Sequence, residues 1–298
     1  MIALKPALTY EKQIAHLKAA HNLTIEDDNA ALDILSKVNY YRLSAYGLGL
    51  TMPGNKELYI DGITLEHLFR LYQFDSRFRN ILVHIIEQLE IQLRTQLSNY
   101  LALKYGSEGY IDPNNFTAIK SKTGDLIHTA VIDSFKKECE RQKLIPFVKH
   151  HMDKYDGHFP IWVAIELFTF GNLSSLFSIM VPDDQKAISA LYGTRPNYLG
   201  SWILALVEVR NICAHYGRLY NMPLKQTPHL YRENKQYQRG KQRKVFPVLL
   251  AIKRMLRNDD RWDSFERQLE SLVDEYSDVL NLSFMGFPAD WKTVLSRP

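Results

Sequence analysis

Residues 64–106 decide the fold of this chain, and they read TLEHLFRLYQFDSRFRNILVHIIEQLEIQLRTQLSNYLALKYG. Apolar side chains recur every three or four positions along this stretch, as they do on the buried face of an α-helix. Thr64 is a typical residue for the N-cap of a helix, and Gly106 is typical of the position that follows a helix end. The stretch therefore predicts one unusually long helix that ends at about Tyr105.

Two acid–base pairs lie four residues apart on this helix, Asp75 with Arg79 and Glu90 with Arg94. Such pairs commonly stabilise an exposed helix face by a few tenths of a kcal/mol. The alternative is that Glu87, Glu90 or Arg94 faces the helix expected at 208–221 and positions its histidine or arginine. The sequence leaves both interpretations open.

The regions around the long helix are also predicted to be helical. We expect residues 1–62 to form a helical extension with a short hairpin at Pro53-Gly54-Asn55, and residues 63–298 to form one helical unit. Almost no stretch is typical of a parallel strand, so the predicted class is all-α. Further helices are expected over residues 125–142 and 161–170, the latter opened by Pro160 and closed by Gly171.

Composition limits the location of the protein more than it limits its chemistry. Of the residues, 46% are hydrophobic and 23% are charged, and the net charge of +4 does not by itself identify a nucleic-acid-binding protein. The two cysteines, Cys139 and Cys213, are too few for a disulfide framework and favour a reducing compartment. The sequence has no apolar signal core and no run of about 20 apolar residues, so we expect a cytoplasmic protein without a membrane partner.

A metal site is one possible interpretation of the histidines after residue 149. Three histidines and one aspartate lie close together in the sequence, at His150, His151, Asp153 and His158. Their spacing matches no strong zinc pattern, and no cysteine lies among them. We therefore predict no metal and no cofactor.

Polar groups suited to phosphate chemistry gather in residues 208–221, which read EVRNICAHYGRLYN. We expect a helix that is capped by Asn197 and runs to about Leu219. At about 100° per residue, such a helix would align Glu208, Asn211, His215 and Arg218 in one stripe, opposite an apolar one.

RNA can be cleaved without a metal when its 2′-OH attacks the adjacent phosphorus. The reaction needs an acid or base with a pKa near neutrality, which histidine supplies, and cations around the phosphate oxygens, which arginine supplies. The candidate catalytic residues are therefore Arg210, Asn211 and His215. The residues expected to support them are Arg218, Glu208, Asn221, Glu90 and Arg94.

One copy of this helix supplies few catalytic groups. Arg210 and His215 are separated by about 140° around a regular helix, and a single imidazole would have to act as both acid and base. Two copies that meet across a two-fold axis would supply two histidines, so we expect a homodimer with the active site at its interface. The alternative is a buried polar network in which Glu90 or Glu166 satisfies His215.

A basic segment follows at residues 232–244, RENKQYQRGKQRK. It is either a solvated loop or an RNA contact in which cations neutralise phosphates and tyrosine stacks on unpaired bases. A second aromatic and basic cluster, NYYRLSAY, surrounds Arg42. The candidate RNA-binding residues are Arg42, Arg232, Lys235, Arg239, Lys241, Arg243, Lys244 and Tyr237.

Residues 210–215 are similar to the R-x4–6-H motif of the HEPN superfamily, and RNICAHYGRLYN at 210–221 resembles the Abi family of bacterial abortive-infection proteins, of the AbiD/AbiF type. Other segments fit that family in the same order along the chain. They are KPALTYEKQIAHL near the start, VNYYRLSAY at 38–46, LYQFDSRFRNILVHIIEQLEIQLR at 71–94, FPIWVAIELFTFGNLSSLF at 159–177 and FMGFPADW at 284–291.

This resemblance implies an all-helical HEPN core, a role in phage defence, and RNA as substrate or ligand. The catalytic positions of the family fall on Arg210 and His215, with Asn211 as the polar residue after the arginine. HEPN proteins often dimerise through this region, and a small structured RNA is a credible antitoxin for an Abi-type toxin.

We therefore expect a metal-independent endoribonuclease toxin. The alternatives are an RNA-binding regulator that holds a small RNA without cutting it, and a helical scaffold with no nucleic-acid role.

Overall fold

The computed structural model describes residues 6–238 and 243–296. Within these ranges the chain is built from α-helices, short 3₁₀ helices and connecting segments, with isolated bridges but no strand. The predicted all-α class is confirmed.

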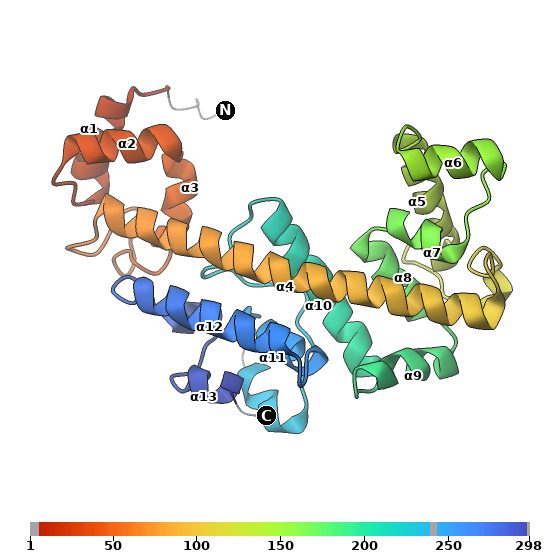
Figure 1. Cartoon of the computed structure of the whole chain (residues 1–298). Helices are drawn as coiled ribbons and strands as arrows, with labels where there is room; N and C mark the ends of the chain where they lie inside the picture. The colour runs from red at the N-terminus through yellow and green to blue at the C-terminus, as the bar shows by residue number, and fades with distance from the viewer. Residues whose placement is uncertain (1–5, 239–242, 297–298) are drawn as a thin grey trace.

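The long helix α4 (Leu65–Tyr105) has 41 residues and crosses the whole molecule (Figure 1). At about 1.5 Å per residue its length is roughly 60 Å. The Thr64 hydroxyl accepts a hydrogen bond from the His67 backbone N–H at 3.0 Å, which caps the first turn as the sequence predicts. The expected helix is confirmed, and its buried face forms the spine of the core.

The N-terminal region contains α1 (Tyr10–His21), α2 (Asp28–Lys37), α3 (Tyr40–Ser44) and a 3₁₀ turn, η1 (Ala45–Gly47). After it, an isolated antiparallel bridge pairs Thr51 with Tyr59. Apolar side chains from this region pack on Leu65 and Leu68 in a cluster separate from the main core. The N-terminal region thus sits on the first turns of α4.

The central helices lie around the other end of α4 (Figure 1). They are η2 (Pro113–Asn115), α5 (Ile127–Arg141), α6 (Pro146–Lys154), α7 (Ile161–Ala164), η3 (Ile165–Leu167), α8 (Phe170–Ile179) and α9 (Pro182–Leu191). The expected helix over 161–170 is wrong, because the chain breaks at Phe168 and restarts. Thr169 and Asn172 form a capping box there, so Gly171 lies inside α8 rather than closing a helix.

Helix α10 (Pro196–Ala214) crosses α4 near its middle (Figure 1). Its N-cap is Arg195 with Pro196 in the first helical position, so the expected cap at Asn197 is wrong. Its end is also earlier than expected, at Ala214 instead of about Leu219. The predicted stripe of four polar residues is therefore broken after Asn211.

The C-terminal part contains η4 (Arg232–Gln238), α11 (Phe246–Met255), α12 (Asp260–Glu275), η5 (Leu282–Met285) and α13 (Trp291–Ser296). Helix α12 packs alongside the first half of α4 (Figure 1). In the described part of the chain, no helix combines the length and the hydropathy needed to cross a bilayer.

Candidate functional site

Arg210 and Asn211 stand in the last turn of α10 and line a cavity of about 410 Å³. Helices α4, α5 and α8, together with η3, supply the other walls. The lining residues are Glu90, Arg94, Glu138, Arg141, Gln142, Glu166, Leu167, Phe168, Thr169, Phe170 and Gly171. Three arginines, with Arg210 among them, and three glutamates therefore line the cavity.

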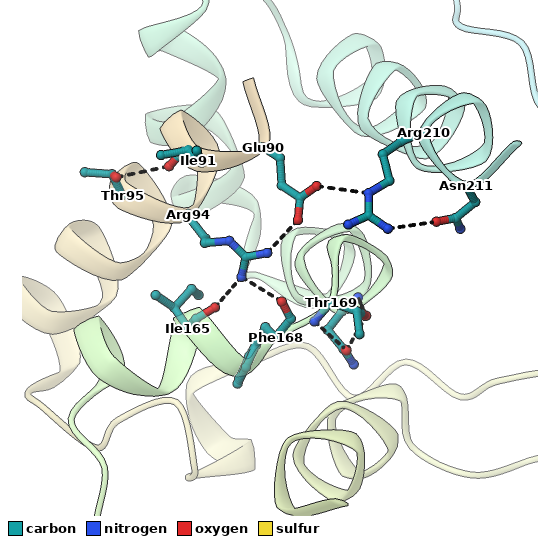
Figure 2. A network of polar contacts seen from close by, with 10 residues as sticks. Glu90, Ile91, Arg94, Thr95, Ile165, Phe168, Thr169, Arg210 and Asn211 are labelled. Carbon is teal, nitrogen blue, oxygen red and sulfur yellow. Dashed lines mark hydrogen bonds and ion pairs between the residues drawn. The ribbon is translucent and has the colours of Figure 1, made fainter. Parts of the chain in front are cut away.

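Glu90 holds Arg210 at the edge of this cavity (Figure 2). The Arg210 Nε lies 3.5 Å from the Glu90 Oε2, and the arginine side chain is 40% exposed while the glutamate side chain is 9% exposed. The Asn211 Oδ1 accepts a hydrogen bond from the Arg210 Nη1 at 3.5 Å. A buried carboxylate thus fixes one side of the guanidinium, and the other side reaches solvent.

Arg94 in turn holds Glu90 (Figure 2). Its Nη2 donates to the Glu90 Oε1 at 2.5 Å, and its Nη1 donates to the carbonyl oxygens of Ile165 and Phe168, the latter at 2.6 Å. Ile165 opens η3 and its carbonyl also accepts the Phe168 backbone N–H at 3.2 Å, whereas the Phe168 carbonyl lies at the break between η3 and α8. The Glu90–Arg94 pair is therefore a buried link between α4, η3 and α10 and not an exposed surface pair.

His215 is the C-cap residue of α10 and is exposed. It does not line the cavity that Arg210 enters. Among residues 6–238 and 243–296, its side chain has no hydrogen-bond or ion-pair partner, and Glu90 is occupied by Arg94 and Arg210. The imidazole thus faces solvent beyond the end of the helix.

The turn after His215 is held by the first half of α4. The carboxylate of Asp75 accepts hydrogen bonds from the backbone N–H groups of Leu219 at 3.1 Å and Tyr220 at 2.8 Å. The Tyr46 hydroxyl donates to the same carboxylate at 2.8 Å, and Arg79 forms an ion pair with it. Burial raises the pKa of the Asp75 carboxyl, and these four donors act against that rise.

Sequence reasoning missed Asp75 as a part of the site. The available signal is its position, because residues 71, 75, 78 and 82 fall on the apolar stripe of the long helix. A charge in that stripe requires a buried partner.

Three predicted supporting residues bind backbone instead of facing the cavity. Arg218 donates to the Ala45 carbonyl oxygen at 2.5 Å, and burial lowers the pKa of its guanidinium. The Asn221 side chain donates to the Leu48 carbonyl at 2.7 Å. Glu208 accepts the backbone N–H groups of residues 225 and 226, the first at 2.6 Å. Of the five supporting residues, Glu90 therefore contacts a catalytic candidate directly, and Arg94 acts on that contact through Glu90.

The basic segment is used in different ways along its length. Arg232 and Lys235 are exposed in η4. Arg239 and Lys241 lie outside the described residues. The Arg243 side chain donates to the Lys225 carbonyl, whereas Lys244 is buried and donates to the Asn221 Oδ1 at 3.1 Å.

The two remaining candidate RNA contacts differ in their surroundings. The Tyr237 ring packs against Phe246, with 5.4 Å between ring centroids, and lines a second cavity of about 560 Å³ that Arg210 does not line. Arg42 is exposed, and its Nη1 donates to the Tyr216 carbonyl oxygen at 2.8 Å. Arg42 therefore lies next to the end of α10.

The histidines after residue 149 serve local contacts. The His158 Nδ1 lies 2.8 Å from a Glu108 carboxylate oxygen, and the His151 ring stacks on Phe159. The described residues contain no group of three or more histidine, cysteine, aspartate or glutamate side chains placed to hold a metal ion.

Comparison with known families now adds to this geometry. The family model for Abi-like protein matches residues 33–221, which is more than half of the 298 residues. This chain belongs to the Abi-like protein family. The searches of curated proteins and of solved structures gave no match.

The match covers the parts of this Abi-like protein that hold the candidate site. It includes Asp75, Glu90, Arg94 and the whole 208–221 segment, and it ends before the basic segment begins. Family membership supports a function of the abortive-infection type in general terms.

Proposed function

We propose that this Abi-like protein is a metal-independent endoribonuclease toxin of phage defence, of the AbiD/AbiF type within the HEPN superfamily, and that it acts in the cytoplasm. One observation carries the proposal. The exposed imidazole of His215, with no partner in the described residues, follows within five residues of an arginine that a buried carboxylate holds in place. General acid–base groups must be accessible, whereas groups that stabilise charge must be fixed in position.

In the proposed reaction, His215 takes the proton from the ribose 2′-OH. The 2′ oxygen then attacks the adjacent phosphorus, the bond from phosphorus to the 5′ oxygen breaks, and the products carry a 2′,3′-cyclic phosphate and a 5′-OH. Arg210 neutralises the phosphate oxygens through the N–H groups that do not face Glu90. The Asn211 Oδ1 accepts one hydrogen bond from the Arg210 Nη1.

A second copy of the chain completes the site in this proposal. Within one chain, Arg210 lines the cavity, whereas His215 lies beyond the end of α10 and does not line it. A two-fold axis near the end of α10 would place the His215 of each copy near the Arg210 of the other, which gives the reaction one imidazole as base and one as acid.

The test is cleavage of RNA by the purified protein in EDTA. We expect fragments with cyclic phosphate ends, and we expect His215→Ala and Arg210→Ala to abolish them. His229→Ala is the matched control, because it removes another exposed imidazole whose backbone carbonyl, not its ring, accepts the Trp202 indole N–H. Cleavage that survives His215→Ala, or that requires a divalent metal, would exclude the proposed mechanism.

The exposed cations of η4 favour a second candidate, an RNA-binding regulator that holds a structured small RNA, such as an RNA antitoxin, without cutting it. Arg232 and Lys235 both reach solvent. Their reversal to glutamate should weaken RNA binding and flatten its salt dependence. RNA that co-purifies intact with the wild-type protein, together with inactivity in the cleavage assay, would select this candidate over the nuclease.

A further inference from the structure

Tyr216, the residue directly after His215, has a backbone conformation that tyrosine rarely adopts. Its φ is +56°, in the left-handed region. The other non-glycine residues with positive φ in the described part of the chain are all asparagine or aspartate, whose short polar side chains tolerate it; they are Asn22, Asp156, Asn221 and Asn258. Tyr216 is therefore the bulky exception.

The conformation comes from the way α10 ends. The Gly217 N–H donates to the Ile212 carbonyl at 2.7 Å, and the Tyr216 N–H donates to the Cys213 carbonyl at 3.2 Å. This pair of bonds defines a Schellman motif, in which the left-handed position is usually glycine. Here glycine comes one residue later, where a Cβ atom would lie 2.9 Å from the Ile212 side chain.

Packing does not explain the tyrosine, because its side chain is not used inside the protein. Tyr216 is 71% exposed. A large aromatic ring is thus held in solvent by a strained backbone, immediately beside the proposed catalytic imidazole. Strain of this kind is a reason to look for a ligand.

The N-terminal region brings a second exposed ring to the same place. Tyr41, in α3, is 87% exposed. The next residue, Arg42, donates to the Tyr216 carbonyl oxygen at 2.8 Å, which fixes α3 against the end of α10. A guanidinium has five N–H donors, so Arg42 retains others for an anion. The contact of Arg42 with the Tyr216 carbonyl therefore brings two segments with exposed rings, a cation and His215 into one neighbourhood.

We propose that Tyr41 and Tyr216 form a stacking platform for unpaired bases of single-stranded RNA, with Arg42 bound to the phosphate between them. The proposal rests on the proposed function for the choice of RNA as ligand, and it names the substrate class. Tyrosine rings stack on unpaired bases without regard to sequence, while the bases of a duplex already stack on one another. The N-terminal region is then part of the substrate site.

Binding is measured by fluorescence anisotropy with a labelled, unstructured RNA of about 12 nucleotides, a length that falls within the range of single-strand binding sites. All variants carry His215→Ala, so that cleavage does not interfere. Tyr216→Gly should weaken binding about tenfold, the order of one lost stacking contact, while thermal stability stays the same or rises because glycine fits the left-handed position. A structural role for the ring would instead lower stability.

Matched variants test the rest of the platform. Tyr41→Ala should also weaken binding about tenfold, whereas Tyr216→Trp should preserve binding. Tyr10→Ala, which removes a partly exposed ring in α1, should leave affinity unchanged. A fully paired RNA of equal length should bind more weakly than the single strand.

Three results would overturn the platform: wild-type affinity in Tyr216→Gly, equal affinity for duplex and single strand, or a change in oligomeric state on light scattering without a change in RNA affinity. The last would assign the rings to a contact between two copies. Cleavage by wild-type protein with unaffected binding in Tyr216→Gly refutes the platform alone, while tyrosine-dependent binding without cleavage refutes the nuclease alone.

Discussion

Replacing Asp75 by asparagine removes the charge that holds the turn after His215 while keeping the shape of the side chain. The carboxylate is fully buried and accepts from Tyr46, Leu219 and Tyr220 in addition to its ion pair with Arg79. An asparagine amide has only one acceptor oxygen, and its NH₂ group would face donors.

The expected loss of folding stability follows from the arginine that stays buried in the variant. Arg79 is 4% exposed, so Asp75→Asn leaves a buried guanidinium without its counter-charge. Removal of one partner of a buried ion pair costs about 3–5 kcal/mol. Since domains are stable by only about 5–15 kcal/mol, this is a large share of the total.

Urea unfolding followed by circular dichroism measures the loss. The matched control is Asp33→Asn, because Asp33 also pairs with a cation four residues later, Lys37, but both side chains are 61% exposed. That variant should lose less than about 0.5 kcal/mol. Amide hydrogen exchange at Leu219 and Tyr220 should accelerate in Asp75→Asn and not in the control.

The double variant Asp75→Asn/Arg79→Met tests whether the loss of stability comes from the buried guanidinium left without a counter-charge. It removes the unpaired guanidinium, so it should be less destabilised than the sum of the two single variants. Equal effects of Asp75→Asn and Asp33→Asn would refute the reasoning.

Three further outcomes are expected. Burial raises the pKa of Asp184, but hydrogen bonds from a lysine and two tyrosines outweigh burial and hold that pKa below its usual value. Asp184→Asn should therefore be less stable than wild type at pH 7, and the difference in urea midpoint should close as the pH falls below about 4. A difference that does not change with pH would contradict this. Gly200 lies inside α10, and a Cβ atom added there would meet only the Phe177 ring, at 3.4 Å. Gly200→Ala should therefore raise the free energy of unfolding by about 0.5–1 kcal/mol. A lower melting temperature would show that Phe177 does not leave room for the methyl group. Burial raises the pKa of Cys139 to about 11 and that of Cys213 to about 12. A disulfide reagent at pH 8 should therefore react with both thiols only after unfolding. Rapid reaction with the folded protein would count against the burial of the two thiols.

The sequence predicted α4 well because its information is local. A run of 41 residues with regular apolar spacing leaves little choice of structure, and Thr64 marks its start. The helix over 161–170 was wrong for a local reason that was overlooked, since Thr169 and Asn172 already have the spacing of a capping box.

The end of α10 could not be predicted in the same way. Beyond its early stop, Asp75, more than 140 residues away, accepts hydrogen bonds from the backbone of Leu219 and Tyr220. A helical wheel assumes that the helix continues, so it placed Arg218 beside His215. Likewise, the choice between Glu90 as a surface pair and Glu90 as the partner of Arg210 was open until tertiary contacts placed α10 beside α4.

Helix α4 contacts both ends of the proposed site from positions 15 residues apart. Asp75 holds the turn that follows His215, and Glu90 holds Arg210. Because each residue of a helix adds about 1.5 Å and about 100°, one residue inserted between them would turn one anchor away from its partner. The length of the helical segment 75–90 therefore fixes the distance between the two anchored parts of the site. Insertions and deletions should be tolerated in the loop at 117–126 but not in residues 75–90.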